Sequence, residues 1–382
     1  MLKNINEQVK KLITLYFYIF EMQCIPSVRC EIINQGRLLV IPIFFTFSAF
    51  CNMWHFLYEV KSLENILDIS ININFFIAGT QAVFTTIIVN IGLKKKQLKV
   101  QRYFDKIVES SENFISEARE KHLSENIKFT NTIVRSFLPI YGVICLLFPV
   151  VAMFQTNFVS PMFYRFPGIP PTSIFFYPVN IIGQVFIYCF VIQLYVSMEC
   201  LFFIYLFYFR GEVHSITAVA ELLSQKENLA KNCDGILRSI YDAHKNLLEE
   251  FTELSKVMWH FYCHKLLGAI FIICSSSFIY SQTNSIASGI VLQILAISLL
   301  VILCVPAQLI DNSSEELRVT LYECLWYEMS LKDQRNFLLI FKGAQRSIKV
   351  ETMGTEKISF TTLVQIMKTA ISYTAFVYTV LL

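Results

Sequence analysis

Charged side chains are scarce in this chain. Only 16% of its 382 residues are Asp, Glu, Lys or Arg, whereas soluble proteins average about 25%. Hydrophobic residues make up 55%, and 35 residues are phenylalanine. The charges are also unevenly placed, because long charge-free stretches alternate with short segments that hold nearly all of them. This distribution excludes an ordinary soluble enzyme and is typical of a protein that crosses a membrane several times.

Sequence motifs for catalysis, cofactors and metals are missing. The 12 glycines form neither a G-x-G-x-x-G motif nor a Walker loop, which argues against a nucleotide site. His260 and His264 have the spacing of metal ligands on a helix, but the Glu of a zinc-protease motif is absent, so we expect structural packing. The net charge of +3 gives no sign of nucleic-acid binding. We therefore predict no catalytic residue, no metal, no cofactor and no nucleic-acid partner.

The charge-free stretches have the length of membrane-crossing helices, about 20 residues or more. Those that fit one crossing each are residues 38–58, 69–93, 136–164, 166–198 and 358–382, the last interrupted by Lys368. The stretch 266–310 is long enough for two helices, and polar residues near Gln282–Ser285 predict a tight turn between them. The expected fold is therefore all-α, a polytopic membrane protein with seven transmembrane helices.

Lysine and arginine indicate which side of the membrane each loop faces, because they concentrate in cytoplasmic loops. Five precede the first span, ten lie between spans 2 and 3, and seven lie in each of the segments 199–265 and 311–357. Only Lys61 and Arg165 lie on the opposite side. We expect a cytoplasmic N-terminus and an extracellular C-terminus, which is the reverse of a G-protein-coupled receptor.

The segments predicted to be cytoplasmic carry helical stripes of apolar residues. In 241–265 the stripe recurs every three or four residues, at Leu247, Phe251, Leu254, Met258 and Phe261. Residues 97–128 and 315–331 show similar stripes. We expect helices 4 to 7 to extend into the cytoplasm and pack together there as an anchor. The alternative is a set of independent helices that lie on the membrane surface.

The end of the chain carries a characteristic order of residues. It runs from Ser314 through Tyr322, Trp326, Arg335 and Leu338 to Ile366-Met367-Lys368-Thr369-Ala370-Ile371-Ser372-Tyr373. This order and spacing resemble the C-terminal signature of the insect odorant receptor family. The gustatory receptors and the odorant receptor co-receptor both have a Gln near the C-terminus that is missing here. The long second cytoplasmic loop of the co-receptor is missing too, so the chain resembles a ligand-tuning subunit.

The resemblance implies an odorant-gated, non-selective cation channel in the plasma membrane of sensory neurons. Its partners would be the odorant receptor co-receptor, in a tetrameric hetero-oligomer, together with membrane lipid, permeating cations and a small volatile odorant. Helix 7 would line the pore, with the gate and its lining at Val380, Tyr373, Val377 and Thr379. Small polar and aliphatic side chains suit a hydrophobic gate, although they also suit a lipid-facing helix.

By the same resemblance, the odorant would bind in the outer half of the membrane, among helices 2 to 6. The matching residues form an apolar cage with a few hydroxyl and amide groups, which suits a small neutral molecule. They are Ile73, Phe76, Ile77, Thr80, Phe148, Ala152, Met153, Tyr177, Asn180, Ile181, Gln184, Tyr188, Phe278 and Ile290. For each residue singly, core packing is the commoner role. Gln184 and Tyr188, one helical turn apart, are the pair of most interest.

These inferences divide the chain into four parts. The first is a cytoplasmic N-terminal segment (1–37), and the second holds transmembrane helices 1 to 6 with the ligand pocket in the outer half (38–310). The third is the cytoplasmic part of helix 7 with the anchor (311–357), and the fourth is the pore-lining helix 7 (358–382). Two other functions stay open. A gustatory-type homotetrameric channel would respond without a co-receptor. A secondary transporter is disfavoured, because internal repeats and broken helices that carry charges are missing.

Overall fold

A computed structural model of the chain describes residues 2–20, 31–58, 66–87, 101–105, 107, 114–155, 164–282, 286–352 and 356–381. The described helices are α1 (Leu2–Phe20), α2 (Glu31–Tyr58), α3 (Ile66–Ile87), α5 (Ile115–Gln155), α6 (Phe176–Glu221), α7 (Lys226–Gln282), α8 (Ile286–Glu323), α9 (Leu331–Ala344) and α10 (Phe360–Leu381). Two 3-10 turns lie between helices: η3 (Leu222–Ser224) between α6 and α7, and η4 (Trp326–Glu328) between α8 and α9. Strand β1 (Glu351–Thr352) pairs antiparallel with β2 (Glu356–Lys357). The predicted all-α class is confirmed.

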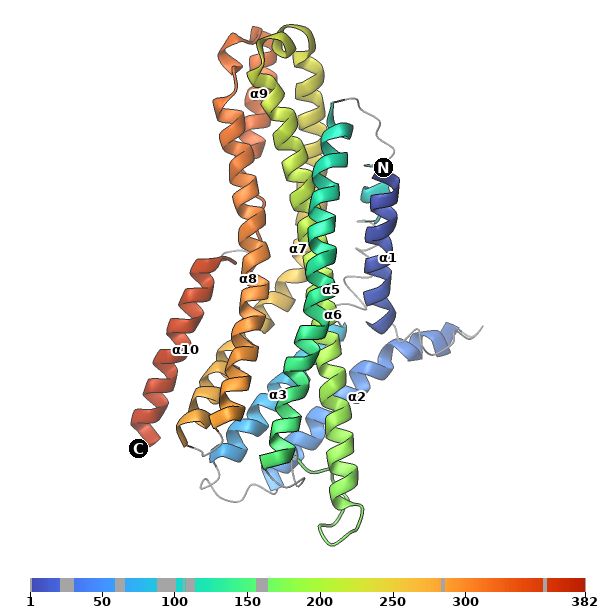
Figure 1. Cartoon of the computed structure of the whole chain (residues 1–382), viewed down its shortest axis with the longest axis vertical. Helices are drawn as coiled ribbons and strands as arrows, with labels where there is room; N and C mark the ends of the chain where they lie inside the picture. The colour runs from blue at the N-terminus through green and yellow to red at the C-terminus, as the bar shows by residue number, and fades with distance from the viewer. Residues whose placement is uncertain are drawn as a thin grey trace.

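Four of the described helices are far longer than a membrane is thick and form the spine of the elongated molecule (Figure 1). Helix α5 has 41 residues, α6 has 46, α7 has 57 and α8 has 38. At 1.5 Å per residue, α6 spans roughly 69 Å and α7 roughly 86 Å, whereas the hydrocarbon core of a bilayer is about 30 Å thick. Each of these helices therefore continues well beyond the apolar stretch from which it was predicted.

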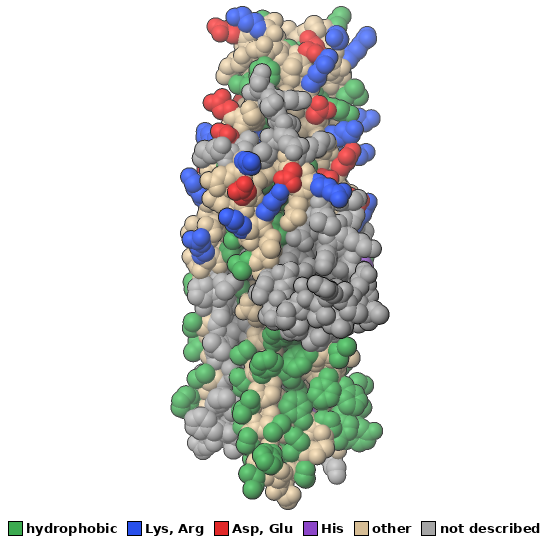
Figure 2. All heavy atoms as spheres, turned by 90° about the vertical axis from the view of Figure 1, so that its right-hand side faces the viewer, with side chains coloured by type: hydrophobic (Ala, Val, Ile, Leu, Met, Phe, Trp, Pro, Cys, Tyr) green, Lys and Arg blue, Asp and Glu red, His purple; other side chains and the backbone are tan. Residues whose placement is uncertain are grey.

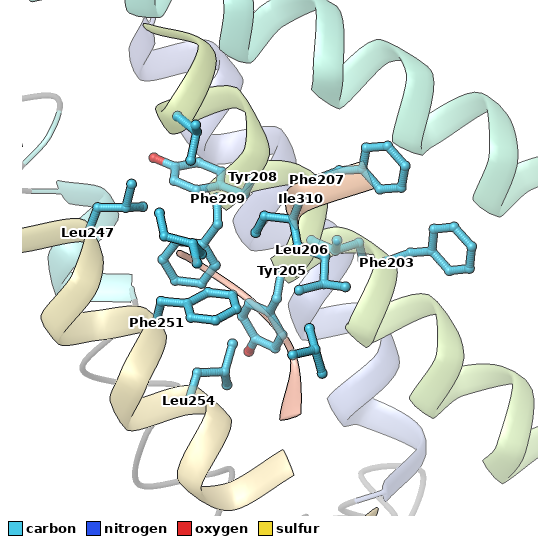
Figure 3. Packing of buried hydrophobic residues seen from close by; sticks show 14 of the residues in the cluster. Phe203, Tyr205, Leu206, Phe207, Tyr208, Phe209, Leu247, Phe251, Leu254 and Ile310 are labelled. Atoms are coloured by element: carbon cyan, nitrogen blue, oxygen red, sulfur yellow. The ribbon is translucent and has the colours of Figure 1, made fainter. Parts of the chain in front are cut away.

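Helix α6 is the centre of the bundle. Every residue from Val196 to Phe209 is buried, which is the property of a helix surrounded on all sides by other helices. Helices α1, α5, α7 and α8 pack around it. Figure 3 shows Tyr205 and Phe209 pointing toward α7, while Phe203 and Phe207 point to the opposite side.

The apolar stripe predicted in residues 241–265 lies on α7 and faces this core. Its members Leu247, Phe251 and Leu254 point toward Tyr205 and Phe209 of α6 (Figure 3), and all are at most 5% exposed. Burial of such side chains contributes about 1.5–3 kcal/mol each. The helices are thus packed together and are not a set of separate surface helices.

Charged and apolar side chains occupy opposite halves of the molecule. On the face in Figure 2, Lys, Arg, Asp and Glu gather in the upper half and hydrophobic side chains in the lower half. Within the part of the chain that the structure describes, the helices long and apolar enough to cross a membrane are Phe176–Ser224, Lys226–Ser277 and Ala296–Glu323. The lower half is therefore the part suited to a bilayer.

The start of the fourth span differs from the prediction. The sequence predicts a helix from residue 166, but α6 begins at Phe176. Pro170 and Pro171 lack a backbone N–H, and Gly168 has a φ of 89°, a conformation that other residues rarely adopt. An apolar but irregular loop therefore precedes the helix.

Two further boundaries can be compared with the prediction. The stretch 266–310 divides as expected, because α7 ends at Gln282 and α8 begins at Ile286. The boundary predicted between 310 and 311, by contrast, falls inside α8, which continues to Glu323. Residues 311–323 therefore prolong the sixth predicted helix, because their apolar stripe at Leu317 and Leu321 stays buried.

Candidate ligand site and pore helix

The first turns of α6 hold the preceding loop in place through two buried amide side chains. Asn180 accepts a hydrogen bond from the Phe166 N–H at 2.7 Å and donates one to the Phe176 carbonyl at 2.8 Å. One turn later, Gln184 donates a hydrogen bond from Nε2 to the Tyr164 carbonyl. Both side chains are at most 2% exposed. Two residues predicted to bind the odorant thus bind the backbone of the protein itself.

Aromatic packing completes this attachment of the loop to α2 and α6. A Cβ atom at Gly183 would lie 2.7 Å from Cε2 of Phe166, so the ring fits only because that position is glycine. The Phe166 ring also stacks on Phe47 of α2, with centroids 6.4 Å apart. The Tyr164 hydroxyl shares a hydrogen bond of 2.8 Å with Ser48 Oγ. Sequence reasoning missed Tyr164 and Phe166, because an aromatic residue in an apolar run carries no sign of a loop.

The other predicted ligand residues lie on several helices. On α3, Ile73 and Phe76 are exposed, Ile77 and Thr80 are half-buried, and the Thr80 hydroxyl donates to the Ile77 carbonyl at 2.8 Å. On α6, Tyr177 is exposed, whereas Ile181 and Tyr188 are partly buried, and Ile290 of α8 is exposed. The remaining predicted residues lie on α5 and α7, with side chains outside the described part of the structure: Phe148, Ala152, Met153 and Phe278.

A small cavity lies among α3, α6 and α7, away from the loop. Its volume of about 10 Å³ is enough for about one water molecule. The lining combines amide, hydroxyl, imidazole and ammonium groups with the rings of two phenylalanines and a tyrosine: Gln81, Phe84, Thr85, Tyr195, Phe261, His264 and Lys265. The sequence prediction missed this cluster, although Gln81 within an apolar run and Lys265 at the edge of another were the available signals.

Charged and aromatic groups next to the cavity pair with each other. Lys265 forms an ion pair with Glu199 of α6, and both side chains are almost fully buried. His264 packs on Phe84 with ring centroids 5.0 Å apart, and His260 packs on Trp259. Among the described residues, no group of three His, Cys, Asp or Glu side chains could hold a metal. The two histidines at i, i+4 therefore have packing partners in this arrangement.

Helix α10 contacts the bundle through a narrow apolar strip. Ile366 and Ala370 are buried in a separate small cluster with Ala269 and Ile273 of α7 and two residues of α8. Apolar and aromatic side chains elsewhere on α10 are exposed, at Val364, Ile371, Tyr373 and Phe376. Of the predicted gate residues, Tyr373 and Thr379 are exposed, whereas Val377 and Val380 lie on α10 with side chains outside the described part.

Comparison with known proteins finds a matching family and similar solved structures. The sequence model of the family described as "7tm Odorant receptor" matches residues 66–371. The structure of the insect olfactory receptor OR5 from Machilis hrabei has a TM-score of 0.75 at 12% sequence identity, covering 97% of this chain and 98% of that one. The same receptor in complex with eugenol gives a TM-score of 0.77, also at 12% identity, with 98% and 99% covered. No curated protein sequence matches significantly.

Proposed function

Because this chain belongs to the odorant receptor family, we propose that it is a channel subunit that binds a small volatile hydrophobic odorant and opens a non-selective cation pore together with a co-receptor. Members of this family are multi-pass membrane receptors of olfaction, so this chain is a receptor and not an enzyme. The family match over residues 66–371 is the observation that carries the proposal. The plasma membrane of sensory neurons is the place where such a current would act.

The proposed topology has seven membrane-spanning helices, with the N-terminus in the cytoplasm and the C-terminus outside. Helices α2, α3, α5, α6, α7, α8 and α10 correspond in order to the seven apolar stretches of the sequence. The upper half in Figure 2, rich in Lys and Arg, would face the cytoplasm. The loop held by Asn180 and Gln184 would then lie at the outer surface.

The proposed odorant site lies near this loop, among the apolar residues of α3, α5, α6, α7 and α8. The eugenol-bound receptor from Machilis hrabei, which shares the fold, makes a small phenolic molecule a reasonable probe. Asn180 and Gln184 would act indirectly, because their amides are hydrogen-bonded to the loop and to Phe176. Tyr188, one turn below Gln184, stays the polar candidate for direct contact.

The charged half of the molecule carries exposed apolar residues that suit contact with other subunits. They lie on the end of α8, on η4 and on α9, at the upper end in Figure 1: Tyr322, Trp326, Tyr327, Leu331, Leu338 and Leu339. Leu331 is 78% exposed and Leu339 is 65% exposed. Large apolar groups exposed outside a bilayer indicate a protein partner. We propose that this surface joins the chain to the co-receptor in a tetramer.

The function can be tested with a panel of volatile compounds that includes eugenol. We expect an odorant-evoked inward cation current in cells that express the chain together with a co-receptor, and none with either protein alone. A robust current from the chain alone would favour the gustatory-type homotetramer. Uptake of labelled odorant into vesicles without any current would favour a transporter. The absence of current with every compound and co-receptor would contradict the channel proposal.

Substitution of the proposed gate should change the closed–open equilibrium. Val380→Ala removes two methyl groups from the proposed hydrophobic constriction. If the closed gate keeps them from water, their loss is worth about 1.5 kcal/mol, or up to about a tenfold increase in basal opening. Single-channel recording would measure it. Val364→Ala is a matched control, because Val364 lies on the same helix and is 49% exposed. Equal basal opening in wild type and V380A would exclude Val380 as the gate.

A further inference from the structure

One hydrogen-bonded side chain joins α3 to both α6 and α7. Gln81 of α3 is 6% exposed and donates from Nε2 to the His264 carbonyl of α7 at 2.9 Å. Its Oε1 accepts a hydrogen bond from the Tyr195 hydroxyl of α6 at 2.6 Å. Both ends of the amide are therefore used, each by a different helix. A buried amide satisfied in this way fixes the positions of the helices it joins.

The surface of α7 is shaped to receive this amide. A Cβ atom at Gly268 would overlap Nε2 of Gln81 and lie 2.7 Å from its Cδ. No side chain larger than a hydrogen can stand at that position while Gln81 keeps its place. Glycine inside a helix costs about 1 kcal/mol relative to alanine, so the close approach is obtained at the expense of helix stability. Gln81 and Gly268 thus form an interlock between α3 and α7.

The interlock joins α3, which carries candidate ligand residues, to α7, which packs against α10, the helix of the candidate gate. Gln81 follows Thr80 directly on α3. One residue beyond Gly268 on α7, Ala269 is buried in the cluster that holds Ile366 and Ala370 of α10. Further along α7, the Cys274 thiol donates to the Ala370 carbonyl at 3.5 Å. A shift of α3 would therefore move α7 through a rigid polar contact, and α7 would move α10.

We propose that Gln81, seated against Gly268, is the positioning residue that couples odorant binding on α3 to α10. This inference rests on the proposed function. Because both ends of the amide are bonded to other helices, we assign it no direct contact with odorant or permeating ions; it sets the relative energies of the closed and open helix arrangements. Its removal should change how much odorant is needed to open the channel and leave single-channel conductance unchanged, because α10 itself is unaltered.

The test uses four variants of the full chain expressed with a co-receptor: Gly268→Ala, Gln81→Ala, the double variant, and Gly79→Ala as matched control. Gly79 lies on α3, and a Cβ there would meet Ala49 Cβ at an ordinary 3.7 Å. We expect G268A and Q81A each to change the half-maximal odorant concentration by about tenfold, within the 5–150-fold range typical of allosteric coupling. G79A should match wild type.

The double variant gives the decisive comparison. Removal of the Gln81 side chain also removes the clash, so Q81A/G268A should respond like Q81A alone. A G268A defect that persists at full size in the Q81A background would overturn the interlock, as would wild-type sensitivity of both single variants at normal surface expression. The unfolding midpoint of the purified complex should follow the same pattern, lowest for G268A. That measurement tests the interlock even if no odorant opens the channel, which separates its failure from failure of the proposed function.

Discussion

The Arg119→Ala variant is expected to lose about 3–5 kcal/mol of unfolding free energy, because it leaves a buried carboxylate without its counter-ion. Arg119 of α5 contacts Glu212 of α6 with Nε 3.2 Å from Oε2, and the two side chains are 5% and 0% exposed. A charge cannot be hydrated at this depth, so its partner supplies most of the compensation. Denaturant unfolding of the purified complex would measure the loss.

An exposed ion pair of the same chemistry provides the control for this prediction. Arg318 and Glu315 pair on the surface of α8, with side chains 47% and 54% exposed. Arg318→Ala should cost less than about 1 kcal/mol, because exposed pairs contribute little. Replacement of both buried partners by apolar residues, R119M/E212L, should restore most of the stability. Equal losses for R119A and R318A would show that burial is not the cause.

The Phe209→Ala variant is expected to destabilise the protein by about 3–5 kcal/mol, because it leaves a cavity at the centre of the bundle. The Phe209 ring is 0% exposed and packs edge-on against Phe251 of α7, with centroids 5.5 Å apart (Figure 3). On another side it stacks with Tyr103 at 6.2 Å. Burial raises the pKa of the Tyr103 hydroxyl well above its usual value, so Tyr103 stays neutral in this core. Thermal or denaturant unfolding would measure the change.

A graded substitution at the same position separates packing from other causes. Phe209→Leu keeps most of the apolar volume and should cost about 1.5 kcal/mol or less. Helix α6 is buried on all sides here. The larger cavity left by alanine could be filled only if whole neighbouring helices shifted, so it stays open. A loss of stability as large for leucine as for alanine would contradict the cavity explanation.

Much of the helical architecture could be predicted from local patterns. The stripe Leu247, Phe251 and Leu254 has the period of a helix with one buried face, and the structure buries it. The polar residues near Gln282 divide the longest apolar stretch where α7 ends. Both signals are local, since a period or a break is visible within one or two helical turns. The start of α6 was misplaced because the preceding loop is as apolar as a span, and only Pro167, Gly168, Pro170 and Pro171 mark it as a loop.

The candidate site was predicted less completely. Asn180 and Gln184 are recognisable as polar groups in an apolar helix, but their partners are backbone atoms of Tyr164 and Phe166, which no spacing rule identifies. The side chains of Val377 and Val380 lie outside the described residues, so the pore assignment stays a prediction. Tyr188 likewise stays a candidate for contact with the odorant.

The amino-acid sequence by itself determined that this protein is helical, with long apolar stretches and charged segments between them. Transfer of a charged side chain into a bilayer is so unfavourable that composition alone separates the membrane segments from the segments in water. Only the tertiary structure decided which polar groups meet. Gln81 and the His264 carbonyl are separated by 183 positions along the chain, and their contact depends on the absence of a side chain at Gly268. A contact of that kind depends on how two helices cross, which is set by the packing of all the others.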